Sequence, residues 1–284
     1  MAKLLSGKEV VATLNEAAQA RAEALREKGV VPTLAIVRVG ERPDDISYET
    51  GATKRCEKLG VAVRRFLLPQ LATQPELLGV IDEINRDGGI HGCLLFRPLP
   101  KQFDEELVRN ALAPEKDVDG ITDGSLAGVF AATGKGFPPC TAQACMEILD
   151  HFGIDVRGKK AVVIGRSLVV GKPAAMMLLK RNATVTVCHT RTVDMPAVCR
   201  EAEVLIVAAG RAGIIGKEYL GQGQIIIDVG IHVNEDGKLC GDVNFAEAEP
   251  LSGAITPVPG GVGTVTTSVL VKHVVEAAER QVFA

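Results

Sequence analysis

A buried strand that runs directly into a glycine-rich turn is the first place in this chain where the residue types suggest chemistry. Residues 161–164 are apolar, and Gly165-Arg166-Ser167 follow them at once. Gly171 and Pro173 then begin a segment with helical character. A strand, a tight turn and a helix start can bind a pyrophosphate on free backbone N–H groups. The spacing is not G-x-G-x-x-G, so an ordinary strand-to-helix connection stays open as the alternative.

The end of the next predicted strand bears on which nucleotide this turn would bind. Sites that prefer NAD place an acidic residue there, about 20 residues past the glycines, to hold the ribose 2′-hydroxyl. Here the strand ends in Cys188-His189-Thr190-Arg191-Thr192, without a carboxylate. Hydroxyl and guanidinium groups suit a 2′-phosphate, and Arg166 offers a second cation. These residues favour NADP over NAD, with a solvated surface charge as the alternative role for Arg191.

Two stretches in the first half of the chain carry side chains suited to a flat heterocycle. Tyr48, one of two tyrosines, lies at the start of a predicted helix, where it can stack on a ring or simply pack. Asp117 and Asp119 flank Val118 in an irregular loop. A carboxylate there can accept two parallel N–H bonds from a 2-aminopyrimidinone edge, or it can stabilise the turn. The turn role fits Asp117 better than Asp119.

Alternating strands and helices must position these residues, which predicts an α/β fold with parallel sheets and helices on their faces. Strands are expected over 33–39, 61–68, 90–96, 161–164, 183–188, 203–208, 224–229 and 254–256. Helices are expected over 6–28, 46–59, 75–86, 104–112, 141–152 and 264–282. We expect Thr141 to cap the helix that it begins, and the glycine-rich stretch 124–139 to be irregular and at the surface.

Composition sets the class of protein. A chain of 284 residues with 46% hydrophobic residues predicts two domains with sizeable cores. A net charge of −3 gives no electrostatic case for a nucleic acid or membrane partner. We find neither a signal peptide nor an apolar run of about 18 residues. Seven cysteines without a C-x-x-C pair predict reduced thiols in a cytoplasmic protein, and the absence of zinc spacing predicts no metal.

Four motifs in a characteristic order give the chain a specific resemblance. They are G-R-S at 165–167 leading to Pro173, P-x-K-D-V-D-G at 114–120, D-V-G at 228–230 and T-P-V-P-G-G-V-G at 256–263. Together they resemble the bacterial FolD family, methylenetetrahydrofolate dehydrogenase/methenyltetrahydrofolate cyclohydrolase. The resemblance implies an α/β protein with a folate-binding domain over 1–139, completed by a helix at 265–284, and a Rossmann-type NADP domain over 140–264. It also implies a tetrahydrofolate substrate and a homodimer.

The same resemblance assigns roles residue by residue. Tyr48 matches the tyrosine that stacks on the substrate, and Asp119 matches the aspartate that binds the pterin ring. Pro257, Gly260 and Gly261 match a wall of the substrate cleft. The matches to cofactor contacts, to which the phosphate argument adds Arg191, are Gly165, Arg166, Ser167, Thr190 and Ile231.

Two departures fall on the residues that the family uses for hydrolysis. The family motif Tyr-x-x-x-Lys here has Ala52 four residues after Tyr48, and Lys54 at the sixth position. The family strand end V-Q-L-P-L-P reads Leu95-Phe96-Arg97-Pro98-Leu99-Pro100, so Phe96 replaces the glutamine that holds the lysine. On a helix the fourth and sixth positions differ by about 200°, so Lys54 is expected to face away from the direction of Ala52.

We therefore expect an NADP-dependent methylenetetrahydrofolate dehydrogenase with weak or no cyclohydrolase activity. Its candidate catalytic residues are Tyr48, Lys54 and Asp119. A bifunctional enzyme, in which Lys54 or a rearranged helix substitutes for the lysine, is the first alternative. The others are a non-catalytic folate- or nucleotide-binding protein and a different NADP dehydrogenase of similar layout.

Overall fold

The computed structural model describes residues 2–282. The chain divides into two compact units, which we name by their sheets. The six-stranded unit consists of the N-terminal residues to Ala12 and of Thr141–Thr266. The three-stranded unit consists of Thr13–Cys140 and of the chain from Thr267 onward. Two long helices, α1 (Gly7–Glu27) and α10 (Val262–Val282), contribute residues to both units.

The sheet of the six-stranded unit is parallel throughout, with the strand order β1-β11-β8-β7-β5-β6. The chain passes from β5 to β6 on one side and then to β7 on the other side of β5. Open α/β sheets bind ligands at such a switch point, outside the carboxyl ends of the strands. The strands are β1 (Lys3–Leu4), β5 (Lys160–Ile164), β6 (Thr184–Cys188), β7 (Val204–Val207), β8 (Ile225–Asp228) and β11 (Ala254–Ile255).

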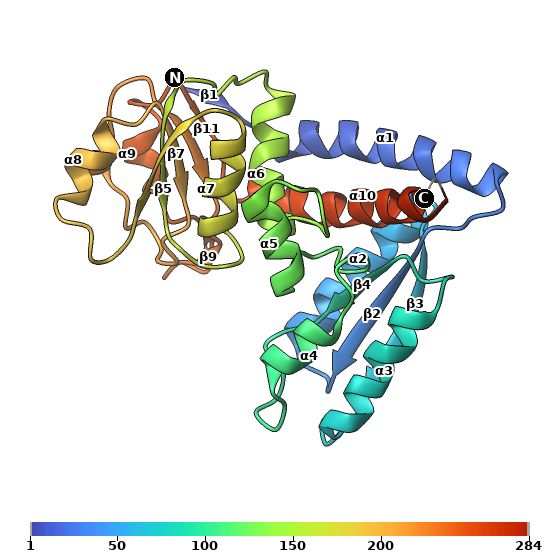
Figure 1. Ribbon diagram of the computed structural model, residues 1–284. Coiled ribbons are helices and arrows are strands. Elements are labelled where there is room, and N and C mark those ends of the chain that lie inside the picture. The colour runs from blue at the N-terminus through green and yellow to red at the C-terminus, as the bar shows by residue number, and fades with distance from the viewer. Residues whose placement is uncertain (1, 283–284) are drawn as a thin grey trace. The chain divides into compact units, whose positions relative to one another are not determined.

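Helices cover both faces of this sheet, as Figure 1 shows, so its inner strands β5, β7 and β8 are largely buried and apolar. All four residues of β7 are buried, and Val162, Ile164, Leu205 and Val207 belong to one core cluster. A short antiparallel hairpin joins β9 (His232–Val233) to β10 (Leu239–Cys240). The covering helices are α6 (Cys140–His151), α7 (Gly171–Lys180), α8 (Met195–Arg200) and α9 (Phe245–Ala248), with a 3₁₀ turn at Lys217–Tyr219.

The three-stranded unit is built around a parallel sheet of order β3-β2-β4. Every residue of the central strand β2 (Thr33–Val39) is buried, whereas the edge strand β3 (Ala62–Leu68) is partly exposed. The third strand is β4 (Gly92–Leu95). The helices of this unit, besides the parts of α1 and α10 that belong to it, are α2 (Pro43–Lys58), α3 (Gln74–Arg86), α4 (Glu105–Ala111) and α5 (Asp123–Ala131).

Within this unit α1 and α10 run side by side in the same direction (Figure 1). Ser268 donates a hydrogen bond to Asn15 at 2.9 Å, and farther along both helices Arg21 pairs with Glu276 at 3.5 Å and with Glu279 at 2.5 Å. The residue numbers of the contacting partners increase along both helices, so the two helices are parallel and these contacts fix their register. The final helix of the sequence thereby packs on a segment more than 240 residues away, as the 253-residue separation of Asn15 and Ser268 shows.

The expected α/β class is confirmed, and three local expectations need correction. The stretch 124–139 is not wholly irregular, because Thr122 accepts a hydrogen bond from Ser125 N and so caps helix α5. Nor is it wholly at the surface, because Phe137 is only 1% exposed. Thr141 does not cap α6, which already begins at Cys140.

The N-terminal strand is a further difference. Lys3–Leu4 pairs with β11, so these residues belong to the six-stranded unit, although the sequence grouped them with the first domain. The pairing is between segments about 250 residues apart, so no local pattern signals it. The last two residues of the helix expected at 265–284 lie outside the described residues.

Two global properties of the chain can be stated from the structure. All seven cysteines, each within the described range, are free thiols, and six of them are buried. Across residues 2–282, none of the helices has the length and apolar character needed to cross a membrane.

Candidate functional site

The turn after β5 is shaped by two glycines that approach the backbone closely. Gly165 has φ +118°, and a Cβ there would lie 2.3 Å from Ala208 O, at the end of the neighbouring strand β7. A Cβ on Gly171 would lie 2.1 Å from Gly165 O. Neither position therefore accepts a side chain without a backbone shift. The turn lies at the switch point of the sheet and leads into α7, whose start receives no side-chain cap.

The polar residues expected at this turn are open to solvent. Arg166 and Ser167 are exposed, and Ser167 Oγ accepts a hydrogen bond from Val170 N at 3.1 Å, which tightens the loop. Thr190 and Arg191 are exposed in the turn after β6, where Arg191 N donates to His189 Nδ1 at 3.1 Å. Because β5 and β6 are parallel neighbours, both turns lie at the same edge of the sheet. The structure therefore brings these candidate residues to one edge.

A small hollow in the same unit collects further predicted residues. It has a volume of about 200 Å³. Ile231, expected at the cofactor, lines it together with Pro257, Gly260 and Gly261, expected at the substrate. Gly7 N donates to Gly260 O at 2.8 Å, so the start of α1 holds this loop. The T-P-V-P-G-G-V-G motif and the residue after D-V-G thus form one wall.

Two buried aspartates stabilise the loops around this hollow, and sequence reasoning missed one of them. Asp228, in the D-V-G motif, accepts hydrogen bonds from the N–H groups of Gly230, Asp242 and Val243. Burial raises the pKa of Asp228 to about 6, against the lowering effect of these bonds. Asp242 was not identified from the sequence. It accepts from Ala209, Gly210 and Arg211 N and lies 2.7 Å from His232 Nε2.

The three-stranded unit contains a separate hollow of about 320 Å³, into which Tyr48 and Asp119 both project. Phe96 also lines it and packs against Tyr48 in a T-shaped arrangement, with ring centroids 5.9 Å apart and planes at 82°. Tyr48 is 40% exposed, so it is available to a ligand rather than buried in the core. The remaining lining residues are Asp44, Asp45, Leu94, Leu95 and Arg97.

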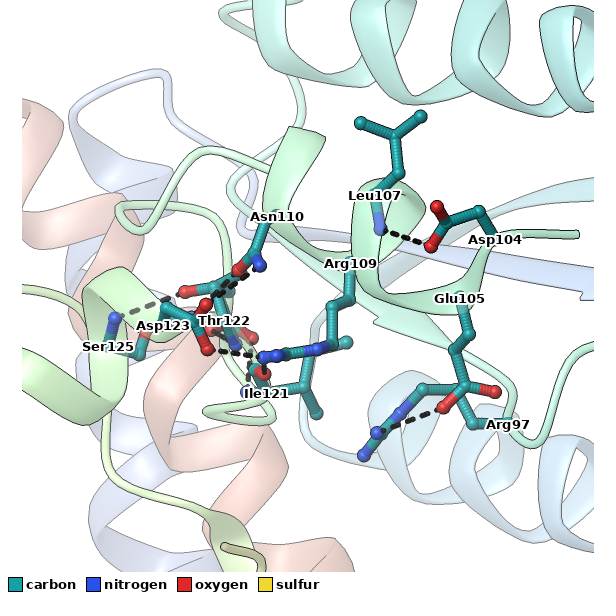
Figure 2. Close-up of polar contacts among 11 residues, drawn as sticks. Arg97, Asp104, Glu105, Leu107, Arg109, Asn110, Ile121, Thr122, Asp123 and Ser125 are labelled. Atoms are coloured by element: carbon teal, nitrogen blue, oxygen red, sulfur yellow. Dashed lines mark hydrogen bonds and ion pairs between the residues drawn. The ribbon is translucent and has the colours of Figure 1, made fainter.

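The K-D-V-D-G loop explains why only one of its aspartates reaches this hollow. Lys116 donates to the carbonyls of Ile84 and Asp87. Asp117 is fully buried and accepts from Ile121 N at 2.9 Å and Thr122 N at 2.7 Å, so it stabilises the turn as expected. Figure 2 shows the next residues, where Thr122 caps α5 and Arg109 holds Ile121 O and Asp123.

The backbone next to Asp119 is fixed by two hydrogen bonds to the carbonyl of Val118. Val118 O accepts a hydrogen bond from His273 Nδ1 at 2.8 Å and from Cys140 Sγ at 3.3 Å, donors on α10 and α6. Burial raises the pKa of Asp119 to about 6, as does Asp117, while Arg97 and the Cys140 thiol oppose this shift. His273 was not identified from the sequence, because its contact joins residues 155 positions apart.

The positions that depart from the family motifs lie on α2 and directly after β4. Ala52 is fully buried, and its methyl group leaves no polar atom at that point of the helix. Lys54, expected as a candidate catalytic residue, is exposed and is not among the described residues that line the hollow. Arg55 donates to Ser268 Oγ at 2.6 Å and is thereby engaged with α10. The cation at this hollow is Arg97, which sequence reasoning passed over.

Comparison with known proteins agrees with this geometry. Residues 5–119 match the family model for the catalytic domain of tetrahydrofolate dehydrogenase/cyclohydrolase, and residues 139–282 match the model for its NAD(P)-binding domain. The chain belongs to this family. It is 52% identical over 281 residues to the bifunctional protein FolD of Carboxydothermus hydrogenoformans, with 98% of each chain covered.

Solved structures show the same fold. The bifunctional FolD enzyme of Campylobacter jejuni superposes with a TM-score of 0.96 at 38% identity and covers 99% of each chain. FolD of Trypanosoma brucei, in complex with NADP cofactor and an inhibitor, superposes with a TM-score of 0.91 at 32% identity, covering 100% of this chain and 99% of that one. The family resemblance of the sequence motifs is therefore confirmed. Among residues 2–282, no cluster of three or more His, Cys, Asp or Glu side chains could hold a metal ion.

Proposed function

We propose that this protein is an NADP-dependent 5,10-methylenetetrahydrofolate dehydrogenase with little or no cyclohydrolase activity. The dehydrogenase part is supported by family membership and by the hollow that combines Tyr48 with Asp119. A stacking ring and a carboxylate are the two groups that a pterin requires. The observation that carries the second part is the replacement of a lysine and a glutamine by Ala52 and Phe96.

The dehydrogenase step needs alignment more than acid or base catalysis. A hydride leaves the methylene carbon with its bonding electron pair and joins the nicotinamide ring, which reduces NADP. The lone pairs of the two flanking folate nitrogens stabilise the methenyl cation that remains. Since the substrate supplies this electronic push, the protein contributes orientation of the two rings. Stacking on Tyr48 and charge-assisted hydrogen bonds to Asp119 are sufficient for that role.

Hydrolysis of the methenyl cation makes a different demand. Water must attack the cation, and a proton must then move within the tetrahedral intermediate as the ring opens. This requires a titratable group held close to the reacting carbon. Ala52 has no such group, and Phe96 replaces the polar partner with a ring packed against Tyr48. A guanidinium offers N–H donors and no acceptor, so Arg97 does not substitute as a base.

The choice of NADP is supported by the exposed cations at the sheet edge. Arg166 and Arg191 follow β5 and β6, and both are open to a 2′-phosphate. A relative of known structure binds NADP in the same fold. The resemblance further supports a homodimer, and the seven free thiols support a cytoplasmic location. Light scattering coupled to size-exclusion chromatography tests the dimer, with a mass of about 60 kDa expected from the 30.0 kDa chain.

A bifunctional enzyme is the second candidate, favoured by the naming of its 52% identical relative as bifunctional. Assaying both steps separates the two. The purified protein should reduce NADP with methylenetetrahydrofolate, while loss of methenyl absorbance should not exceed the buffer rate. Robust hydrolysis by the wild type that disappears in Lys54→Ala would instead establish the bifunctional alternative. Absence of NADP reduction would favour a non-catalytic binding protein.

A gain-of-function variant tests the same hypothesis through an expected increase in hydrolysis. The double substitution Ala52→Lys with Phe96→Gln restores both family residues, and it should raise methenyl hydrolysis well above the wild-type rate. Each single substitution should do less, because the two side chains act as a unit. Ala52 is fully buried, so circular dichroism must first show that the double variant is folded.

A further inference from the structure

Arg97 has a place in the three-stranded unit that the proposed function does not use. It follows β4 directly after Phe96 and lines the hollow with Tyr48 and Asp119. The family strand end has an apolar leucine at this position. Among the described lining residues, Arg97 is the single cation, beside the carboxylates of Asp44, Asp45 and Asp119. A guanidinium has therefore been added to the side of the hollow where a pterin is expected.

The described residues leave part of this guanidinium without a hydrogen-bond partner. Arg97 Nη1 lies 3.5 Å from Glu105 Oε1, a long ion pair that Figure 2 shows. The second oxygen of Glu105 accepts from Leu99 N at 2.8 Å, so Glu105 is tied to the backbone. Arg97 Nε is buried and has no hydrogen-bond partner among the described residues. A desolvated donor without a partner is unfavourable, and such a group commonly marks a site completed by a ligand.

Arg97 also acts on Asp119. Burial and Asp117 raise the pKa of the Asp119 carboxyl, while the Arg97 charge and the Cys140 thiol lower it. Arg97 thus favours the ionised carboxylate that can accept two N–H bonds. The two side chains supply an acceptor and a donor to one hollow.

We propose that Arg97 is a specificity-determining residue that donates a hydrogen bond to the 4-oxo group of the pterin while Asp119 accepts from the neighbouring N3–H and 2-amino group. This edge of a 2-amino-4-oxopyrimidine presents two donors and one acceptor in a row. A carboxylate next to a guanidinium is complementary to that order. The inference rests on the proposed function, because it assigns the pterin to the Asp119 hollow.

A pair of folates that differ along this edge tests the assignment. Folic acid carries the 4-oxo group and N3–H, whereas aminopterin carries a 4-amino group, which offers donors where Arg97 needs an acceptor, and an N3 without hydrogen. Dissociation constants of both should be measured by calorimetry for the full-length wild type and for Arg97→Leu. Arg97→Lys retains a cation without the planar fork. Arg86→Leu removes an arginine of the same unit that is exposed on α3, and it serves as the matched control.

Wild type should bind folic acid more tightly than aminopterin. Arg97→Leu should weaken folic acid by about 30-fold and leave aminopterin nearly unchanged, so the preference should fall by about 30-fold and keep only the part that Asp119 supplies. Arg97→Lys should recover part of it, and Arg86→Leu should retain all of it. An unchanged preference in Arg97→Leu, or failure of an enzymatically active wild type to bind folic acid, would overturn the inference.

The dehydrogenase assay keeps this result separate from the proposed function. In Arg97→Leu the KM for methylenetetrahydrofolate should rise while kcat changes little, because Arg97 binds a part of the substrate remote from hydride transfer. NADP reduction by the wild type, with a folate preference that does not depend on Arg97, would retain the proposed function and reject the inference. If the protein could not reduce NADP but its folate preference depended on Arg97, the proposed function would be rejected and the role of Arg97 would be retained.

Discussion

The Gly165–Gly171 turn and the Lys116–Gly120 loop are the two regions proposed to recognise ligands, and they are built by opposite means. The turn is shaped by glycines, its Arg166 and Ser167 are exposed, and the proposed phosphate-binding groups are largely those of its backbone. In the loop, Lys116, Asp117 and Val118 are buried, and a single side chain, Asp119, reaches the hollow.

The difference follows from the ligand parts that the two regions are proposed to bind. A phosphate keeps its charge in water, so an exposed turn with free N–H groups is sufficient for it. A flat pterin is read along its hydrogen-bonding edge, and that requires a carboxylate at a fixed position in a partly dehydrated hollow. Burial raises the pKa of Asp119 and so disfavours its charged form, and the Arg97 cation and the Cys140 thiol oppose this effect. The following predictions test this contrast.

Asp119→Asn should have the largest effect. The amide would place a donor against the donors of the pterin edge, so kcat/KM should fall at least about 100-fold while NADP binding is unchanged. Titration of nucleotide fluorescence and steady-state kinetics measure the two effects. Comparable losses on the nucleotide and folate sides would contradict the separation of roles.

The same residue predicts a pH dependence. Asp119 must be ionised to accept, and its pKa is raised to about 6, so folic acid affinity should be constant above about pH 7. Below pH 6 it should weaken about tenfold per pH unit as the carboxyl becomes protonated. Asp119→Asn should lack this slope. Binding rather than turnover is the suitable measurement, because Asp228 in the other unit also has a pKa of about 6.

Gly171→Ala should have an intermediate effect, confined to the nucleotide side. The new Cβ would lie 2.1 Å from Gly165 O, and the required backbone shift should weaken NADP binding about 30-fold. Gly79→Ala on α3 is the control, because a Cβ there meets nothing within 4 Å. If folic acid affinity fell as strongly as NADP affinity in Gly171→Ala, the turn would not be specific to the nucleotide.

Arg191→Ala should have the smallest effect. Its side chain is exposed, so its interaction with a 2′-phosphate is screened by solvent and should contribute about a fivefold preference for NADP over NAD. The ratio of the kcat/KM values for NADP and NAD, in wild type and in the variant, measures this preference. An unchanged ratio would shift the phosphate assignment to Arg166.

Local patterns were sufficient for part of this description. Apolar strands that end in glycine, and the alternation of strands with helices, predicted the α/β class and the Gly165 turn. The sequence also predicted correctly that Asp117 stabilises its own turn. Helix α5 was missed, because its cap at Thr122 lies just before a glycine-rich stretch whose composition is typical of loops.

The sequence by itself determined the identity of the groups that can do chemistry: the glycines of the turn, Tyr48, Asp119, and the loss of lysine and glutamine at Ala52 and Phe96. Only the tertiary structure decided which groups meet. His273 contacts Val118 O, Asp242 binds the backbone of residues 209–211, and Arg97 lines the same hollow as Asp119, so each case brings together separate segments of the chain. Such contacts arise from how helices pack on the sheets, and no local periodicity records them.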